Sequence, residues 1–491
     1  MKMNNEELRM KNEECAQPSS RPLREGRGGS LSNWRWWICG LLFAATMVNY
    51  MDRQVLSLTW NDFIAPEFGW TNSDYGLITG FFSLAYAFIS LFAGKFIDWA
   101  GTRRGYIIAI LVWSVGACLH ALCGWGAVRT ASALMLSVGA VSVWMFMACR
   151  FVLALGEAGN FPAAIKVTAE YFPKKDRALA TSIFNAGSSI GALLAPACIP
   201  WLASKYGWEM SFVIIGALGF LWMGFWLTMY DHPEQSRHVN EAELAYIRQD
   251  EITSPTPSQA EVEEEKVIPY WHCFRYRQTW SFVAGKFFTD GVWWFFLFWA
   301  PAYFSDQYGY KSDSREAVLL LSLLYFIVTI LSIGGGYLPK YFVERRGMEP
   351  YAGRMRAMLL FALFPLTALL AQPLGTVSAW FPAIIIGLAG AGHQSWSANL
   401  YSTIGDMFPK STIGTITGIG TMAGGIASFL INWGSGEFFD YCKAMGSGFQ
   451  FFSFEGKEAG YMIVFCLCAV CYLVAWLVMK ALVPRYKKIT V

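Results

Sequence analysis

Charged side chains are scarce in this sequence. Asp, Glu, Lys and Arg make up 15% of the 491 residues, against about 25% in an ordinary soluble domain. Hydrophobic residues make up 55%, so a soluble fold of this length would have too few polar side chains to cover its surface. The composition excludes a disordered chain and a single soluble domain, and it favours a protein solvated by a lipid bilayer.

Several kinds of functional site are also missing from the sequence. The 38 Lys and Arg nearly balance the 35 Asp and Glu, so nucleic acid is not an expected partner. No Ser/His/Asp set, metal-ligand cluster or phosphate-binding glycine loop is evident, so we expect neither an enzyme nor a bound cofactor. The eleven Cys lie mostly in apolar runs, where inert thiols are expected. No secretory signal is evident in the polar first 33 residues, so the first apolar run is expected to be a retained anchor.

Long apolar segments are what the sequence has instead. A helix needs about 20 mostly apolar residues to cross a bilayer, and twelve segments qualify. They are 35–57, 74–97, 105–125, 133–171, 177–202, 208–230, 279–304, 316–339, 355–372, 377–406, 413–436 and 459–482. The fourth is long enough to project beyond the bilayer or to bend, and the apolar stretch around 126–145 before it has no assigned place. The prediction is an all-α membrane protein of twelve transmembrane helices in two pseudo-symmetric bundles.

The predicted domains follow from these segments. They are an N-terminal tail (1–33), a six-helix bundle (34–230), a polar linker (231–278), a second six-helix bundle (279–484) and a C-terminal tail (485–491). Lys and Arg are more frequent in the loops after even-numbered segments and in both tails. Because such residues favour the cytoplasmic side, both termini and the linker are expected in the cytoplasm, with the bundles in the inner membrane of a bacterium.

The two halves of the chain resemble each other. The triplet F-P-K occurs at 172–174 and again at 408–410, and a weaker similarity joins 94–104 to 336–347. Internal repeats are typical of secondary carriers, whose substrate site lies between the halves near the middle of the membrane. Such carriers need no cofactor, because an ion gradient drives them, and one chain is expected to be sufficient for transport.

Asp52, Arg53, Arg150 and Glu157 are charged residues that lie well inside predicted spans. A charge at the bilayer centre costs about 3 kcal/mol on insertion scales. One explanation is that the four only hold helices together. We favour a functional explanation, because apolar packing could replace a purely structural ion pair at little cost.

A carboxylate substrate suits Arg53, since a guanidinium donates two parallel hydrogen bonds. A bound anion would neutralise part of the positive charge and make nearby acids easier to protonate. Anion and proton would then bind cooperatively, as thermodynamic linkage requires. Asp52 and Glu157 are therefore the expected proton-coupling residues.

Further polar and aromatic residues are expected to complete a cavity for a sugar ring. They are Tyr50, Tyr86, Arg150, Asn185, Ser188, Trp293, His393, Gln394, Asn399 and Thr421. Asp98, Arg103 and Arg104 lie at the predicted cytoplasmic edge of the membrane. An acid there can cap a helix or pair across the halves, so these three are expected to tune conformational change.

These motifs resemble a known family along nearly the whole chain. GKFIDWAGTRR is similar to the loop signature of the major facilitator superfamily, and NYMDRQVLSL and GVWWFFLFWAPAYF resemble its anion:cation symporter family. HQSWSANLYSTIGDMF resembles the hexuronate permeases in particular. The resemblance implies that Asp52 and Glu157 are protonation sites, that Arg53 binds the substrate carboxylate and that Arg150 is the partner of Glu157. Tyr50 and Tyr86 would line the site.

The predicted function is proton-driven import of a hexuronate such as glucuronate or galacturonate. An aldonate symporter, or an organic-anion exchanger of the same family, is one alternative. Ser188 and Thr421 stand where galactonate carriers have a glutamine and an asparagine, which weakens the galactonate alternative and leaves the recognition of the sugar hydroxyls open. A membrane sensor with a transporter fold is a weaker alternative, because the 48-residue linker is short for an output domain.

Overall fold

The computed structural model describes residues 31–249, 268–487 and 489. Most of both predicted tails and the middle of the predicted linker lie outside these residues. The described chain is almost entirely helical, apart from a two-stranded hairpin of β1 (Gln450–Phe451) and β2 (Phe454–Glu455). The predicted all-α fold is therefore confirmed.

The first half forms a bundle of six long helical segments. They are α2 (Trp34–Thr59), α4 (Asn72–Ala100), α5 (Thr102–Leu119) continued by α6 (Cys123–Leu134), α7 (Val138–Glu157) with α8 (Asn160–Tyr171), α9 (Lys174–Tyr206) and α10 (Trp208–Met229). Short turns join some of them, namely η1 (Trp60–Ile64), α3 (Ala65–Phe68) and η2 (His120–Leu122).

The unassigned stretch around 126–145 extends the third and fourth spans. The third helical segment continues through η2 into α6 and ends only at Leu134, and α7 begins at Val138. A small apolar cluster of Ala127, Ala131 and Val141 packs α6 against the start of α7. The fourth segment therefore starts later than its predicted boundary of 133, and the added residues form a helical hairpin.

The second half repeats the arrangement of the first. Its long segments are α14 (Arg277–Tyr308), α15 (Arg315–Arg346), α16 (Pro350–Leu366) continued by η3 (Thr367–Leu370) and α17 (Ala371–Gly375), α18 (Trp380–Met407), α19 (Lys410–Met445) and α20 (Gly456–Leu482). The turn η4 (Gly446–Gly448) precedes the hairpin, and α11 (Glu241–Ile247) and α13 (Tyr270–Cys273) lie between the halves.

The F-P-K triplets occupy equivalent places in the two bundles. Phe172 ends α8 and Pro173 caps α9, just as Phe408 ends α18 and Pro409 caps α19. Proline without an N–H group suits the start of a helix, where that donor would have no intrahelical partner. The sequence repeat thus corresponds to a structural repeat.

Nine helical segments in the described part of the chain are long and apolar enough to cross a membrane. Three further long helices, α2, α14 and α18, occupy the positions of predicted spans one, seven and ten. These three helices carry Arg53, Asp290 and His393, so polar residues that face a protein interior interrupt their apolar runs.

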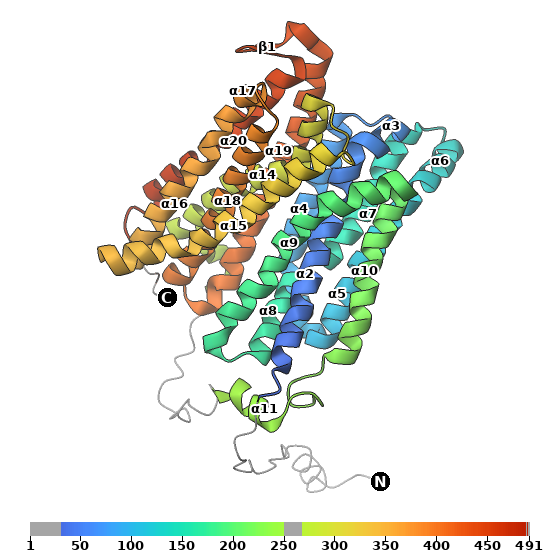
Figure 1. Ribbon diagram of the computed structural model, residues 1–491. Helices are drawn as coiled ribbons and strands as arrows, with labels where there is room; N and C mark the ends of the chain where they lie inside the picture. Colours follow the sequence, from blue (N-terminus) through green and yellow to red (C-terminus); the bar gives the residue numbers. More distant parts are fainter. Residues whose placement is uncertain (1–30, 250–267, 488, 490–491) are drawn as a thin grey trace.

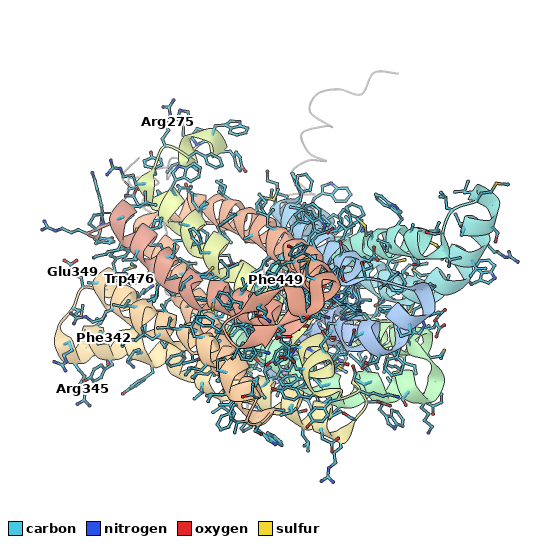
Figure 2. All side chains as sticks on the ribbon, turned by 90° about the horizontal axis from the view of Figure 1, so that it is seen from above. Arg275, Phe342, Arg345, Glu349, Phe449 and Trp476 are labelled. Atoms are coloured by element: carbon cyan, nitrogen blue, oxygen red, sulfur yellow. The ribbon has the colours of Figure 1, made fainter. Side chains whose placement is uncertain are left out.

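The two bundles lie side by side, with α4 and α19 in close contact between them (Figure 1). The view from above in Figure 2 separates the blue-to-green first bundle from the yellow-to-red second bundle. Phe342, Arg345 and Glu349, labelled there, mark the turn between α15 and α16 at the outer edge of the second bundle. The surface where the bundles meet is called the seam below.

Both described chain ends lie at one end of the bundle, with the linker. Here Arg35 Nη1 at the start of α2 donates to Glu243 Oε1 of α11 over 2.9 Å. Helix α11 begins directly after Asn240, whose Oδ1 accepts from Glu243 N over 2.9 Å. This end is called the tail end, and the opposite end, which carries α3 and the β-hairpin, is the tail-free end.

Candidate functional site

A buried ion pair between α2 and α7 forms the centre of the site. Arg53 Nη2 donates to Glu157 Oε2 over 2.6 Å, and Arg53 Nε donates to the same oxygen over 3.0 Å. The side chains are only 3% and 0% exposed. The second carboxylate oxygen, Glu157 Oε1, has no hydrogen-bond partner among the described residues. Glu157 is therefore positioned to hold the guanidinium while keeping one oxygen free.

Four aromatic rings surround the Arg53 guanidinium. Its central carbon lies 4.8 Å from the ring centroid of Tyr86, 5.0 Å from Tyr50 and 5.6 Å from Phe82. The fourth ring, Trp294, lies at 4.9 Å and belongs to α14 of the second bundle. A cation is stabilised over such ring faces. The contact with Trp294 places Arg53 at the seam, as the predicted central site requires.

Arg150 lies deeper in the first bundle and is 1% exposed. Its Nε and Nη1 have no hydrogen-bond partner in the described part of the chain, and its guanidinium lies 5.3 Å from the ring of Phe82. The expected pairing of Arg150 with Glu157 is not observed, because Glu157 is paired with Arg53. Residues seven apart on a helix are separated by about 10 Å along its axis, whereas the packing of α2 brings Arg53 directly against Glu157.

Asp52 points away from Arg53 into the interior of the first bundle. It is 1% exposed, and neither carboxylate oxygen has a hydrogen-bond partner among the described residues. Electrostatic interactions connect it with Glu157 and Arg150. Adjacent residues on a helix point about 100° apart, which explains why Asp52 and Arg53 have different surroundings. Asp52 therefore belongs to the same charged group as Glu157 without lining the seam.

A small cavity lies at the seam and is lined by Tyr50, one of the rings that surround Arg53. It has a volume of about 10 Å³, which is room for about one water molecule. Its lining comes from both bundles and includes Tyr50, Ser188, Ser189, Trp293, Tyr325, Thr329 and Gln394. The cavity therefore brings together four of the predicted site residues, namely Tyr50, Ser188, Trp293 and Gln394. The walls must separate before a sugar acid can enter.

His393 supports one wall of this cavity from behind. Its ring is parallel to that of Trp293, with centroids 5.3 Å apart and an interplanar angle of 2°. Its Nδ1 lies 2.7 Å from the hydroxyl oxygen of Tyr472. Trp293 lines the cavity and His393 does not, so the contact of His393 with the cavity is indirect, through the ring of Trp293.

Asn399 binds the protein backbone. Its Nδ2 donates to the carbonyl oxygens of Ser395, over 2.8 Å, and Gly335, over 3.2 Å. The amide therefore joins α18 to α15 inside the second bundle. Of the other predicted residues, Asn185 is exposed on α9 and Thr421 is half-buried on α19. Neither residue lines the small cavity.

The three residues predicted to tune conformational change lie at the tail end. Asp98, whose side chain is exposed, accepts from Lys166 Nζ of α8 over 2.9 Å. Arg103 Nη1 donates to Asp231 Oδ1 over 2.7 Å, and Arg104 is exposed. Asp98 thus pairs with Lys166 of the same bundle, and Arg103 pairs with Asp231 directly after that bundle. Among the described residues, neither forms a pair across the halves.

The sequence also places Asp290 among the polar groups expected at the cavity, but it gives no expectation for Lys286, with which Asp290 forms a second buried ion pair on α14. Lys286 Nζ lies 2.6 Å from Asp290 Oδ2, and the side chains are 6% and 13% exposed. Lys286 Nζ also donates to the Tyr401 hydroxyl over 3.1 Å. The available signal was a lysine seven residues inside the predicted span 279–304, too far from its end to be dismissed as a boundary residue.

Polar contacts between the bundles seal the seam at the tail-free end. Asp440 of α19 accepts from Asn72 N, over 3.1 Å, from Asn72 Nδ2, over 2.7 Å, and from Ser73 N, over 2.7 Å. Asp62 accepts from Ser305 Oγ, over 3.0 Å, and from Ser312 N, over 2.6 Å. These contacts close the route from the site to the tail-free side.

Aromatic rings lie beneath this polar seal. Trp60 and Tyr75 of the first bundle are stacked at 4.1 Å, and both contact the edge of Trp299 from α14. The hydroxyl of Tyr75 donates to the backbone oxygen of Phe298 over 2.7 Å. A layer of rings therefore separates the seal from the small cavity.

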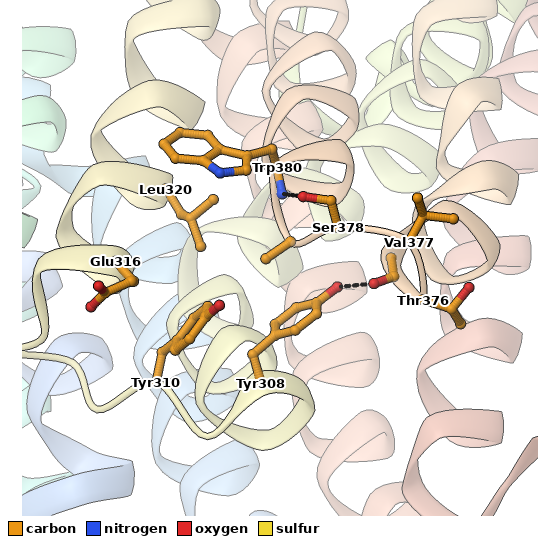
Figure 3. Close-up of a pocket in the computed structure, with 10 residues that line it drawn as sticks. Tyr308, Tyr310, Glu316, Leu320, Thr376, Val377, Ser378 and Trp380 are labelled. Carbon is orange, nitrogen blue, oxygen red and sulfur yellow. Dashed lines mark hydrogen bonds between the residues drawn. The ribbon is translucent and has the colours of Figure 1, made fainter.

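A larger pocket lies at the tail-free end of the second bundle (Figure 3). Its volume is about 350 Å³, and Tyr308, Tyr310 and Trp380 are among its lining residues. Glu316 is the charged residue in this lining. An acid would repel an anionic substrate, so the volume of this pocket does not make it the better candidate site.

Relatives of the chain include transporters of sugar acids. It is 29% identical over 399 residues to the hexuronate transporter of Escherichia coli K12, covering 81% of this chain and 85% of that protein. It is 28% identical over 330 residues to the galacturonate transporter of Dickeya chrysanthemi, covering 67% and 88%. A probable galactarate/D-glucarate transporter of Bacillus subtilis is 28% identical over 402 residues, covering 82% and 84%.

Solved structures share the fold. A bacterial homologue of the human lysosomal transporter Spinster, inward-facing and occupied, has a TM-score of 0.64 at 18% identity, covering 93% of this chain and 97% of that chain. The xylose transporter XylE of E. coli, partially occluded and inward open, has a TM-score of 0.62 at 15% identity, covering 93% and 100%.

The family model of the Major Facilitator Superfamily matches residues 42–431. The relatives and the structural neighbours are transporters, which confirms the prediction of a membrane transport protein rather than an enzyme. The apolar helices and these relatives together make the chain a multi-pass integral membrane protein. The chain belongs to the major facilitator superfamily.

Proposed function

We propose that this protein imports a hexuronate, with Arg53 as the ligand of the substrate carboxylate. The observation that carries the proposal is the buried Arg53 guanidinium at the seam, held by Glu157 and surrounded by rings from both bundles. Flat ring faces suit a sugar, and the guanidinium fork suits its carboxylate. The hexuronate and galacturonate transporters among the relatives support this substrate class.

Proton symport is part of the proposal. A substrate carboxylate that takes the place of Glu157 on Arg53 leaves the Glu157 carboxylate buried without its cation. Burial without a donor or counter-ion favours the neutral form of a carboxyl group, so substrate binding promotes proton uptake. Asp52, buried nearby without a hydrogen-bond partner among the described residues, is placed to share that proton.

Alternating access supplies the transport step. The seal of Asp62 and Asp440 closes the tail-free side, so the site next communicates with the tail end. The excess of Lys and Arg in the tails and in the loops of that end supports a cytoplasmic location for it. The proposed cycle releases substrate to the cytoplasm across a bacterial inner membrane. It is driven by the proton gradient without a cofactor, and a monomer suffices.

The test is uptake into proteoliposomes that contain the purified protein. Labelled glucuronate, galacturonate and galactonate are supplied with and without an inward proton gradient. We expect accumulation of a hexuronate that collapses with a protonophore. Accumulation that persists without any proton gradient would indicate exchange, and transport of galactonate alone would indicate the aldonate alternative.

A further inference from the structure

Two cysteines lie in contact where α6 packs against α7. Cys123 is the first residue of α6, and its Sγ atom lies 3.6 Å from Sγ of Cys149 on α7. Both belong to the ten described cysteines that are free thiols. Neither the Arg53 site nor the closure of the tail-free end uses this pair, so it is available for chemistry of its own.

Close packing holds the two helices together beside the cysteines. A Cβ atom added at Gly126 of α6 would lie 2.3 Å from Cε of Met145 on α7. Farther along the hairpin, Ala127, Ala131 and Val141 form a small apolar cluster between the same helices. A disulfide bond is about 2 Å long. Two sulfur atoms that already lie 3.6 Å apart on packed helices therefore need only a short approach to become bonded.

A neighbouring cation favours ionisation of one of the two thiols. Cys149 is followed by Arg150, with which it interacts electrostatically. Nε and Nη1 of this buried guanidinium have no hydrogen-bond partner among the described residues. The thiolate is the form of cysteine that attacks a disulfide, and a nearby arginine stabilises it. Cys149 is also half-buried whereas Cys123 is fully buried, so Cys149 is the thiol that reacts first.

The pair lies close to the water at the tail-free end, to which α6 projects (Figure 1). Trp125 follows Cys123 by two residues and Trp144 precedes Cys149 by five, and these indole side chains are 62% and 68% exposed. Exposed tryptophans are typical of the membrane–water interface. Five residues of helix are about 7.5 Å long, so a small reagent at the interface can reach Cys149.

We propose that Cys123 and Cys149 form a redox-active pair, which a small disulfide oxidises to a disulfide bond that joins α6 to α7. The Cys149 thiolate attacks one sulfur of the oxidant, which forms a mixed disulfide and releases the other sulfur as a thiolate. Cys123 gives its proton to that thiolate and attacks the Cys149 sulfur, which releases the second half of the oxidant. Two protein thiols are thereby oxidised, and one disulfide of the oxidant is reduced to two thiols.

The inference goes beyond the proposed transport function and is independent of the substrate. The proposed orientation places the tail-free end on the periplasmic side of the membrane, where disulfides persist in bacteria. The bond would close a loop between residues that are 26 positions apart in the sequence. Such a cross-link restricts the unfolded chain, so oxidation should stabilise the α6–α7 hairpin.

The test treats the purified protein with dithiodipyridine, a small aromatic disulfide, and maps the cysteines by peptide mass spectrometry. We expect a peptide pair that joins Cys123 to Cys149 to form at least about tenfold faster than the buried Cys468 is modified, since exchange follows access and thiolate fraction. The unfolding temperature in detergent should rise with the cross-link. A stable mixed disulfide on Cys149 without a bond to Cys123 would overturn the proposal, as would a pair that stays reduced.

Two variants complete the design. Cys466→Ser/Cys471→Ser removes two half-buried thiols from α20, and it should form the cross-link at the wild-type rate. Cys149→Ser should leave Cys123 unmodified, and the oxidant should no longer raise its unfolding temperature. A bond from Cys123 to a different cysteine in the wild type would overturn the assignment. The readout is chemical, so it does not depend on whether the protein transports a hexuronate.

Discussion

At the scale of single residues, the site depends on how a buried cation is stabilised before substrate arrives. Arg53 meets an acid on one side and ring faces on the others. Removing one member of a buried ion pair destabilises a protein by about 3–5 kcal/mol, because the remaining charge is uncompensated. Substitutions that keep the charge therefore separate recognition from folding.

Arg53→Lys is the first such substitution. It keeps the positive charge for Glu157 but loses the planar fork that a carboxylate prefers. We expect hexuronate binding to weaken about 10- to 100-fold, the equivalent of about 1.5–3 kcal/mol for a charge-assisted hydrogen bond. Calorimetric titration of the purified protein measures the change, and unchanged affinity would remove Arg53 from the site.

Glu157→Gln tests proton coupling. The amide cannot take up a proton, so proton-driven accumulation of hexuronate should be abolished while exchange of preloaded substrate continues. Uptake with an imposed pH gradient, and counterflow without one, measure the two activities. Glu67→Gln, at the hydrogen bond to Trp208 near the tail-free end, is the control and should stay coupled. Full gradient-driven accumulation in Glu157→Gln would place the coupling site elsewhere.

At the scale of helices, the backbones of α4 and α19 touch directly where the bundles meet, because glycine leaves no side chain between them. A Cβ atom at Gly436 of α19 would lie 2.3 Å from the backbone oxygen of Asn72 at the start of α4. Small residues allow such close approach of membrane helices. The α4–α19 contact therefore leaves no room for a larger side chain at Gly436.

Gly436→Ala should hold α4 and α19 apart. Overpacking of this kind costs about 1–3 kcal/mol, so we expect a lower thermal unfolding temperature in detergent and a slower initial rate of hexuronate uptake. Gly434→Ala is the matched control, since nothing lies within 4 Å of a Cβ atom there. Equal effects of the two substitutions would show that the contact is not specific.

At the scale of the whole molecule, closure of one end balances opening of the other. Asp440 gathers three hydrogen bonds from Asn72 and Ser73 across the seam. These contacts exist only while the tail-free end is closed, so they determine the relative populations of the two states.

Asp440→Ala should shift this balance. Hydrogen bonds to a charged group contribute about 1.5–3 kcal/mol, so the population open at the tail-free end should rise by a factor of 10 or more. Spin labels on unnatural amino acids at the tail-free ends of α4 and α19 report the opening as a longer distance. Lys443→Ala, at an exposed position on the same helix, should leave the distance distribution unchanged.

The sequence by itself determined the bilayer environment, the approximate positions of the long helices and the repeat of two halves. These features follow from local properties, since apolar run length and the F-P-K triplets act within a helix or at its ends. It also singled out Asp52, Arg53, Arg150 and Glu157, because an ionised side chain in an apolar run is unusual regardless of its partner.

Only the tertiary structure decided which charges meet. Glu157 is paired with Arg53, 104 residues away, and not with Arg150 on its own helix. The position of Trp294 against Arg53 and the hydrogen bond from Asn399 to the backbone of α15 also depend on how helices pack. Hydropathy shows that a helix crosses the membrane, but the side chains it contacts depend on its rotation and depth relative to its neighbours, which are properties of the packed bundle.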